Sequence, residues 1–444
     1  MTDVPCWVAP GTLAGLIQRG HGAGRSAARS DPARAGALGL ACLTDDPRWD
    51  QQIEERGWYY ATLAMDCGVP AELIGESLRG LPRPPAGYAD HGGALVVDVL
   101  QHLAARGVPG AIPSLLDYLR SGRRLDLALD ALLPFAAHPE ASGLLEDLLA
   151  VADDETLRDT LAFRRDLARA PWSDWRDASP RIDRAIAATA RPRAETTTSA
   201  DRGAFQAAAR AAVLRAMRAA KLPRLPDVPA GACWEAALLA HGAELLQDDD
   251  LAPAVRRTVR NSLRALRSPD ALRWARSHAF SRGPVSATAR SMLITLAEPA
   301  DGPALAARLA TALADDDIYA QCDLVPALGR IRYQPSVTTV SALFDTTGYS
   351  YLRARAAVAL SRMSPAFGPT RAIECLDDSD SGTRELGARF AGREARERLY
   401  EAAHDPAEAD TVRRAAAAQL AGWDQDRTSP PDEGRPPGAS IDLR

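Results

Sequence analysis

The 444-residue sequence contains little of what marks membrane-spanning or secreted proteins. Aromatic residues make up only 5%. Valine and isoleucine, which favour strands, are sparse beside alanine and leucine, which favour helices. No run of about 18 uninterrupted apolar residues occurs, so we expect no membrane-spanning segment. The first residues include no basic region followed by an apolar run, so we also expect no signal peptide and a cytoplasmic location.

The sequence also lacks the spacings that indicate a metal or cofactor site. The seven histidines include no pair at helical metal-ligand spacing, and no nucleophile motif of the G-x-S-x-G type occurs. The glycine-rich stretch Gly20–Ser26 has no lysine and no preceding strand, so it is not a phosphate loop. We therefore expect no metal and no cofactor, and the sequence leans against an enzyme. None of the six cysteines lies in a C-x-x-C pair, which is typical of buried thiols in a reducing compartment: Cys6, Cys42, Cys67, Cys233, Cys322 and Cys375.

Lysine is almost absent, and arginine supplies the positive charge. Lys221 is the one lysine, and the formal net charge is −5. This bias is typical of a high-GC bacterial genome, although a surface selected for bidentate contacts with phosphate or carboxylate groups would have the same composition. The acidic balance argues against a dedicated nucleic-acid-binding protein.

Helix start and stop signals recur along the chain. Asp31-Pro32 predicts a helix that runs to Leu43, and Asp46-Pro47 predicts another that runs to Cys67 and stops at Gly68. Apolar residues follow at three- and four-residue spacing, and no convincing alternating strand occurs. The sequence therefore predicts an all-α protein made of short helices of about 11–16 residues joined by tight turns.

A repeat of about 30 residues organises the second half of the chain. Leucine or phenylalanine recurs late in every second predicted helix, each preceded by small or apolar residues three and four positions earlier: Leu266, Leu296, Leu328, Leu360, Phe390 and Leu420. This spacing predicts one buried stripe per helix, which only stacked neighbours can cover.

Two of these helices resemble a known repeat family. The segments 352–360 (LRARAAVAL) and 412–420 (VRRAAAAQL) resemble the second helix of a HEAT repeat. The resemblance implies an armadillo-like α-solenoid of about 8–10 stacked antiparallel helix pairs in a right-handed superhelix. It says little about function, because HEAT-like solenoids include scaffolds, chromophore lyases and DNA glycosylases.

Breaks in the repeat suggest the domain organisation. We expect a partly flexible N-terminus (1–30), an N-terminal HEAT-like half (31–170), an irregular insertion or linker (171–203), C-terminal HEAT-like repeats (204–425) and a disordered tail (426–444). In the insertion, Trp172 and Trp175 flank Asp174, and we expect them to plug the space between the two halves.

An arginine recurs near the start of the second helices, as Arg260, Arg290, Arg353, Arg384 and Arg413. In HEAT-like repeats this arginine usually hydrogen-bonds aspartates in nearby turns, so the ladder has a structural explanation. The additional arginines carry more weight for binding, because that network does not need them. The candidate partner-binding residues are Arg256, Arg257, Arg260, Arg264, Arg290, Arg353, Arg355, Arg384, Trp58 and Tyr59.

The segment 49–60 concentrates aromatic residues. On one continuous helix, Trp49, Ile53 and Tyr60 would share a face, while Trp58 and Tyr59 would point elsewhere. These aromatics form either the core of a capping region or a site for a partner.

From these patterns we expect an interaction or scaffold protein that binds a protein or peptide on its concave surface. The first alternative is a nucleic-acid-binding protein that resembles HEAT-like DNA glycosylases. The second is a small-molecule or cofactor enzyme that resembles HEAT-like lyases. The sequence identifies no catalytic residue and no oligomeric state.

Overall fold

The computed structural model describes residues 7–51, 53–80, 91–162, 164–189, 230–251, 253–281 and 283–428. These residues form 24 α-helices and short 3-10 helices, and no strand occurs among them. The all-α prediction is therefore confirmed. Among the described helices, none combines the length and apolar character needed to span a bilayer.

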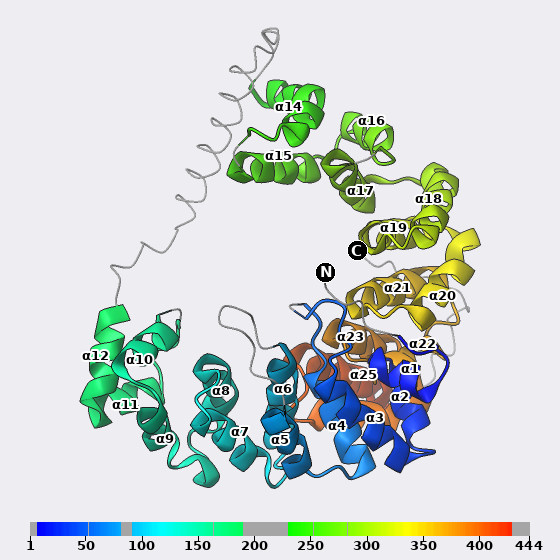
Figure 1. Ribbon diagram of the computed structural model, residues 1–444. Coiled ribbons are helices and arrows are strands. Elements are labelled where there is room, and N and C mark those ends of the chain that lie inside the picture. Colours follow the sequence, from blue (N-terminus) through cyan, green and yellow to red (C-terminus); the bar gives the residue numbers. More distant parts are fainter. Residues whose placement is uncertain are drawn as a thin grey trace. The chain divides into compact units, whose positions relative to one another are not determined.

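The chain folds into two compact units. Unit 1 comprises Met1–Leu115, Gly348–Ser350 and Pro365–Arg444, so it combines both ends of the chain. Its helices (Figure 1) are α1 (Leu13–Gln18), α2 (Gly22–Ala28), α3 (Pro32–Thr44), α4 (Gly57–Cys67), α5 (Ala71–Gly80), α6 (His91–Ala105), α22 (Arg371–Cys375), α23 (Ser381–Phe390), α24 (Arg396–His404) and α25 (Asp410–Thr428).

Within unit 1, neighbouring helices pack in sequence, and α2 also contacts α22 from the other end of the chain. In the N-terminal part, α3 packs on α4, and α4 packs on α6. In the C-terminal part, α23 and α24 both pack on α25. The core of unit 1 therefore joins segments that the sequence-based boundaries assign to different halves.

Unit 2 comprises Leu116–Thr347 and Tyr351–Ser364. Helix α7 (Ala111–Arg120) crosses from unit 1 into unit 2. The helices that follow are α8 (Leu125–Leu132), α9 (Leu144–Val151), α10 (Asp154–Leu161), α11 (Trp172–Ala178), α12 (Pro180–Thr189), α14 (Ala230–Gln247), α15 (Pro253–Ala265), α16 (Pro269–His278), α17 (Pro284–Leu296), α18 (Gly302–Ala314), α19 (Ile318–Arg330), α20 (Val337–Thr346) and α21 (Ser350–Met363). The 3-10 helices of the chain are η1 (Leu133–Phe135), η2 (Pro139–Ala141), η3 (Pro299–Asp301), η4 (Gln334–Ser336) and η5 (Arg393–Ala395).

From α14 onward, unit 2 repeats one arrangement. Helices α14, α16 and α18 pack on α15, α17 and α19, respectively. Helix α15 in turn packs on α17, and α17 packs on α19. Helix α21 continues this row, because a Cβ atom built on Gly329 would meet Ala359 at 2.6 Å. We call α15, α17, α19 and α21 the second helices; each stands beside the next along the row.

Side-chain caps start many of these helices, as the sequence predicts. Asp31 accepts a hydrogen bond from the Arg34 backbone N–H at 3.2 Å, and Pro32 occupies the first turn of α3. Helix α4 ends at Gly68, whose φ of 67° is easily adopted only by glycine. Ser268, Asp317 and Asp380 cap α16, α19 and α23 in the same way. These local signals act within one turn, so they need no tertiary contact.

The predicted helix start at Asp46-Pro47 is wrong, because α4 begins only at Gly57. The Asp46 carboxylate accepts from the backbone N–H of Arg48 at 3.0 Å and also binds the Arg48 guanidinium. This turn takes the place of a helix cap. Glu54 then accepts from the backbone N–H groups of Trp49 and Asp50 at 2.6 and 3.0 Å, which closes a compact turn.

Two further expectations differ from the structure. Residues 172–189, expected to be irregular, form α11 and α12, and Trp172 is fully buried against Trp175. The N-terminal segment contains α1 and α2, which pack on each other, and its partial flexibility stays a prediction. The predicted stripe anchors are buried at Leu328 and Leu360, whereas Phe390 is 40% exposed. The tail from 429 onward and residues 190–203 lie outside the described residues.

Candidate functional site

The second helices carry a large excess of arginine. Between them they contain one acidic residue, Asp323 on α19. Their arginines are Arg256, Arg257, Arg260, Arg264, Arg290, Arg330, Arg353, Arg355 and Arg362. Because these helices pack side by side, their charges act on one another across the row.

Helix α15 is the most basic element of the row. Val259 and Leu263 are its fully buried residues, and Arg256, Arg260 and Arg264 follow one another at four-residue spacing. At about 100° per residue these three arginines line one face, beside the apolar stripe. Arg256 is paired with Asp249 at 3.3 Å. Arg264 is exposed, and α15 itself contains no carboxylate.

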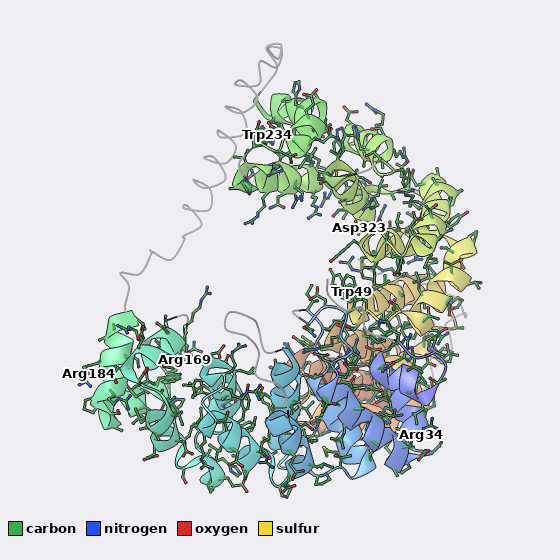
Figure 2. All side chains as sticks on the ribbon, in the orientation of Figure 1. Arg34, Trp49, Arg169, Arg184, Trp234 and Asp323 are labelled. Carbon is green, nitrogen blue, oxygen red and sulfur yellow. The ribbon has the colours of Figure 1, made fainter. Side chains whose placement is uncertain are left out.

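Asp323 lies where several of these arginines converge. It stands on α19, on the same side of the row as side chains that extend from α15 (Figure 2). Burial raises the pKa of the Asp323 carboxyl above its usual range, and the charges of Arg290, Arg355 and Arg264 offset this only in part. Three arginines from three helices, α15, α17 and α21, thus surround one carboxylate of α19.

Arg290 is only 9% exposed, and neutral groups hold both Arg290 and Arg355 in place. Nη1 of Arg290 donates to Oγ of Ser286 at 2.6 Å, and its Nε lies 3.7 Å from the Asp323 carboxylate. Nη1 of Arg355 donates to the Cys322 carbonyl at 3.0 Å, and the guanidinium stacks 4.3 Å from the centroid of the Tyr351 ring. Among the described residues, Nε of both arginines is buried without a hydrogen-bond acceptor.

We call Arg256, Arg257, Arg260, Arg264, Arg290 and Arg355, together with Asp323, the arginine face. Arg264, Arg290 and Arg355 act on Asp323, and Arg256 pairs with Asp249, so the face has more arginines than carboxylates. At the C-terminal ends of α19 and α21, burial and the charge of Arg362 lower the pKa of Arg330, while Asp301 and Glu298 act in the opposite direction. Such a face attracts carboxylate or phosphate groups.

Two other predicted binding arginines are buried and hold the fold instead. Arg353 is fully buried, and its Nη1 lies 3.5 Å from the Thr347 carbonyl. Arg384 is 3% exposed and binds the Glu408 carboxylate through Nε and Nη2 at 2.9 and 2.7 Å. Its Nη1 donates to the carbonyls of Asp378 and Ser379. Neither guanidinium is exposed to a partner, and Arg384 makes the turn contacts expected of a structural ladder.

Trp58 and Tyr59 are also buried, in unit 1, at 7% and 1% exposure. The hydroxyl of Tyr59 donates to the His21 carbonyl at 3.2 Å, and the hydroxyl of Tyr60 donates to the Ile17 carbonyl at 3.2 Å. These bonds hold α4 against the α1–α2 segment. Both aromatic side chains therefore belong to the core of unit 1, and Trp58 also lines a pocket of that unit.

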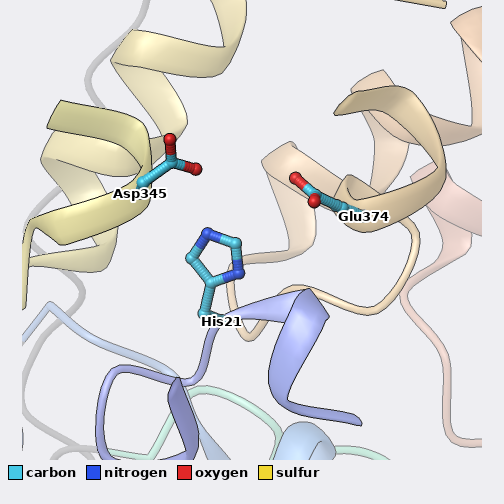
Figure 3. A group of neighbouring side chains, drawn as sticks. All are labelled: His21, Asp345 and Glu374. Atoms are coloured by element: carbon cyan, nitrogen blue, oxygen red, sulfur yellow. The ribbon is translucent and has the colours of Figure 1, made fainter. Parts of the chain in front are cut away.

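The contact between α2 and α22 brings His21 close to Glu374 (Figure 3). Nδ1 of His21 accepts from the Ala23 backbone N–H at 3.1 Å and so caps α2. One ligand-type atom of His21 and one of Glu374 lie within 4.8 Å of each other. Asp345, also labelled in the figure, belongs to α20 of unit 2. The His21–Glu374 pair shows how closely the two ends of the chain approach within unit 1.

Sequence reasoning missed the acidic and aromatic members of the unit 2 face. Asp323 stands five residues before Leu328, and Arg355 stands five residues before Leu360. Asp323 and Arg355 therefore occupy the same position when α19 and α21 are aligned at these leucines. Tyr319 and Tyr351 each stand nine residues before the same leucines, and they are 65% and 38% exposed. Comparing every aligned position of these helices, and not only the arginines, would have identified Asp323, Tyr319 and Tyr351.

Comparison of the sequence with protein-family models finds no match. Comparisons with curated proteins and with solved structures find none either.

Proposed function

We propose that this chain is an interaction protein that binds an acidic segment of a partner protein on its arginine face. The observation that carries the proposal is the excess of arginine over carboxylate on adjacent second helices. Asp323 is the sole acidic residue of the four second helices. Guanidinium groups form paired, charge-assisted hydrogen bonds with carboxylates, and several on one face favour an extended acidic chain.

The architecture supports the same proposal. A row of helix pairs in which α15, α17 and α19 pack successively is the arrangement expected of HEAT-like repeats, and we propose that the chain is an α-solenoid of this kind. Such a row exposes a broad face whose residues recur with the repeat. Tyr319 and Tyr351 are exposed at equivalent repeat positions and supply the aromatic contacts that often anchor a peptide.

A peptide fits this face better than a nucleic acid does. The whole chain has a net charge of −5, which repels a polyanion as long as DNA. The carboxylate of Asp323 in the middle of the face would also oppose a continuous line of phosphates. A short acidic segment places its charges beside the arginines and still accommodates Asp323.

The test is a binding titration by fluorescence anisotropy with a labelled oligoglutamate peptide and a length-matched oligothymidine. We expect the peptide to bind, with an affinity that falls as salt rises. The triple variant Arg257→Gln, Arg260→Gln, Arg264→Gln should bind it about tenfold more weakly, since each exposed pair contributes roughly 0.5 kcal/mol.

A matched control removes the same charge elsewhere. Arg29→Gln, Arg34→Gln and Arg158→Gln change three exposed arginines outside the arginine face and should leave the affinity unchanged. Equal weakening by both triple variants would mean that only net charge matters and would contradict the proposal. Tighter binding of oligothymidine than of the peptide would replace it with a nucleic-acid function.

A further inference from the structure

Unit 1 contains a pocket of about 340 Å³ between α4 and α24. It lies wholly within this unit, and its walls come from both ends of the chain. Residues of α2, α4 and the end of α6 form one side, and residues around α22 and α24 form the other. The volume is that of a site for a small molecule. No residue of the arginine face takes part in it.

One guanidinium nitrogen in the wall is buried without an acceptor among the described residues. Arg106 is 8% exposed in its side chain; its Nε and Nη2 bind the Asp405 carboxylate at 3.0 and 2.7 Å, and its Nη1 has no hydrogen bond. Arg398 also lines the pocket and pairs with Asp377 through Nη2 and with Glu401 through Nε. Guanidinium donors fit a carboxylate.

The same wall has more carboxylates than arginines. Three arginines line the pocket, Arg25, Arg106 and Arg398, against four acidic residues, Asp66, Asp377, Glu401 and Asp405. Glu401 is the most accessible of these, with a side chain that is 54% exposed and one contact to Arg398 at 3.4 Å. An anion alone would increase the negative charge of the pocket. A ligand that also carries an ammonium group would place a cation beside Glu401.

Apart from Thr62 and His404, the remaining lining is apolar. The ring of Trp58 borders the pocket and is fixed from within, because its Nε1 donates to Asp405 at 3.2 Å. Met65 lines the pocket and is 46% exposed, which is unusual for a large apolar side chain. Leu376 and Pro406 complete this surface. Such a wall accommodates an aliphatic side chain, and the flexible Met65 adapts to its shape.

We propose that this pocket binds a free α-amino acid with an aliphatic side chain. The carboxylate is held by Arg398 and Arg106, the ammonium group by Glu401, and the side chain by Trp58 and Met65. The site is separate from the arginine face, so this inference does not depend on the function proposed for unit 2.

Isothermal titration calorimetry of the full chain tests the proposal with three probes that share one side chain. L-Leucine carries both charged groups, 4-methylpentanoate lacks the ammonium group, and 3-methylbutylamine lacks the carboxylate. We expect leucine to bind at millimolar concentration or below, and each single-charge analogue to bind at least about tenfold more weakly. L-Valine, L-isoleucine and L-methionine extend the series. Failure of all four amino acids to bind would overturn the proposal, as would equal binding of either analogue.

Two variants locate the site. Glu401→Gln removes an exposed carboxylate with one contact, so the protein should fold normally and bind leucine about tenfold more weakly, with 3-methylbutylamine affected in parallel. Glu397→Gln, an exposed position on the same helix outside the pocket, is the matched control and should bind leucine normally. Arg398→Gln should weaken leucine and 4-methylpentanoate together. Unchanged leucine binding in Glu401→Gln would contradict the assignment even if Arg398→Gln failed to fold.

Discussion

The guanidinium carbon of Arg384 lies 3.9 Å from the centroid of the Trp58 ring, although the two residues stand at opposite ends of the chain. Both belong to unit 1, where Trp58 lies on α4 and Arg384 on α23. A cation this close to a tryptophan face is held by the ring's quadrupole, and burial strengthens the attraction. The contact joins the N-terminal and C-terminal helices into one core, and the pocket of about 340 Å³ lies beside the same tryptophan.

The stability of this core should depend on Glu408, the carboxylate partner of Arg384. Glu408→Gln leaves a buried guanidinium without its counter-charge, because the two side chains are 3% and 1% exposed. We expect a loss of about 3 kcal/mol in the free energy of unfolding, measured by guanidinium chloride denaturation. Glu385→Gln, whose partner Arg389 is largely exposed, should cost less than about 1 kcal/mol. Similar losses in both variants would mean that the buried pair has no special role.

Glu54 should stabilise unit 1 in a pH-dependent way. Burial favours the neutral acid, but the charge and hydrogen bonds of Arg56 and the backbone N–H groups of Ser350 and Asp50 outweigh it, so the pKa of Glu54 lies below its ordinary 4.5. The folded state therefore binds this proton less tightly than the unfolded state. The stabilisation is present above pH 4.5 and is lost as the pH falls through the lowered folded-state pKa.

Glu54→Gln should accordingly lose about 3 kcal/mol of unfolding free energy at about pH 7, and the gap to the unmodified protein should narrow below pH 4.5. Denaturant titrations at several pH values measure this gap. The neighbouring Glu55 is exposed, so Glu55→Gln serves as the control and should show neither effect. A gap that stays constant through the acidic range would exclude the linkage.

Asp323 should behave in the opposite way. Because burial raises its pKa above the ordinary 3.8, the folded state binds this proton more tightly than the unfolded state does. The ionised carboxylate therefore costs stability above its folded-state pKa, and this cost disappears as the pH falls through that value toward 3.8. Asp323→Asn should be at least as stable as the unmodified protein at neutral pH and should show less stabilisation on acidification.

The same substitution bears on the arginine face. Removing the central carboxylate leaves Arg290 and Arg355 without their opposing charge, so Asp323→Asn should bind oligoglutamate about two- to tenfold more tightly. Asp315→Asn makes the same change of net charge at an exposed position and serves as the control in the anisotropy titration. Weaker binding by Asp323→Asn would show that the carboxylate organises the face instead of opposing the ligand.

Leucines at equivalent positions of different helices should contribute unequally to the free energy of unfolding. Leu360 is 2% exposed, whereas Leu266, which directly follows α15, is only half-buried. Leu360→Ala should destabilise by about 2–5 kcal/mol through lost burial and a residual cavity. Leu266→Ala should cost about 1 kcal/mol, because its site is already partly open to solvent. Equal losses in denaturant unfolding would mean that both leucines are packed to the same degree.

Local signals in the sequence predicted the helical class and several helix ends. The cap at Asp31 and the left-handed stop at Gly68 act within one turn, and the apolar spacing marks the helices between them. The prediction failed at Asp46-Pro47, because the Asp46 carboxylate binds the backbone and guanidinium of Arg48 and caps no helix there. Glu54 then accepts from the backbone N–H of Trp49 in the same turn.

By itself, the sequence determined an all-α chain of short helices, with leucine or phenylalanine at intervals of about 30 residues and several arginine-rich helices. Tertiary structure alone decided which arginines stay at the surface. Arg353 and Arg384 are buried because their guanidinium groups find carbonyls and a carboxylate inside the fold, whereas Arg257 and Arg264 on α15 remain exposed. It also decided that Trp58 meets Arg384. Spacing along one helix determines which residues share a face, but contacts between helices distant in sequence depend on how whole elements pack.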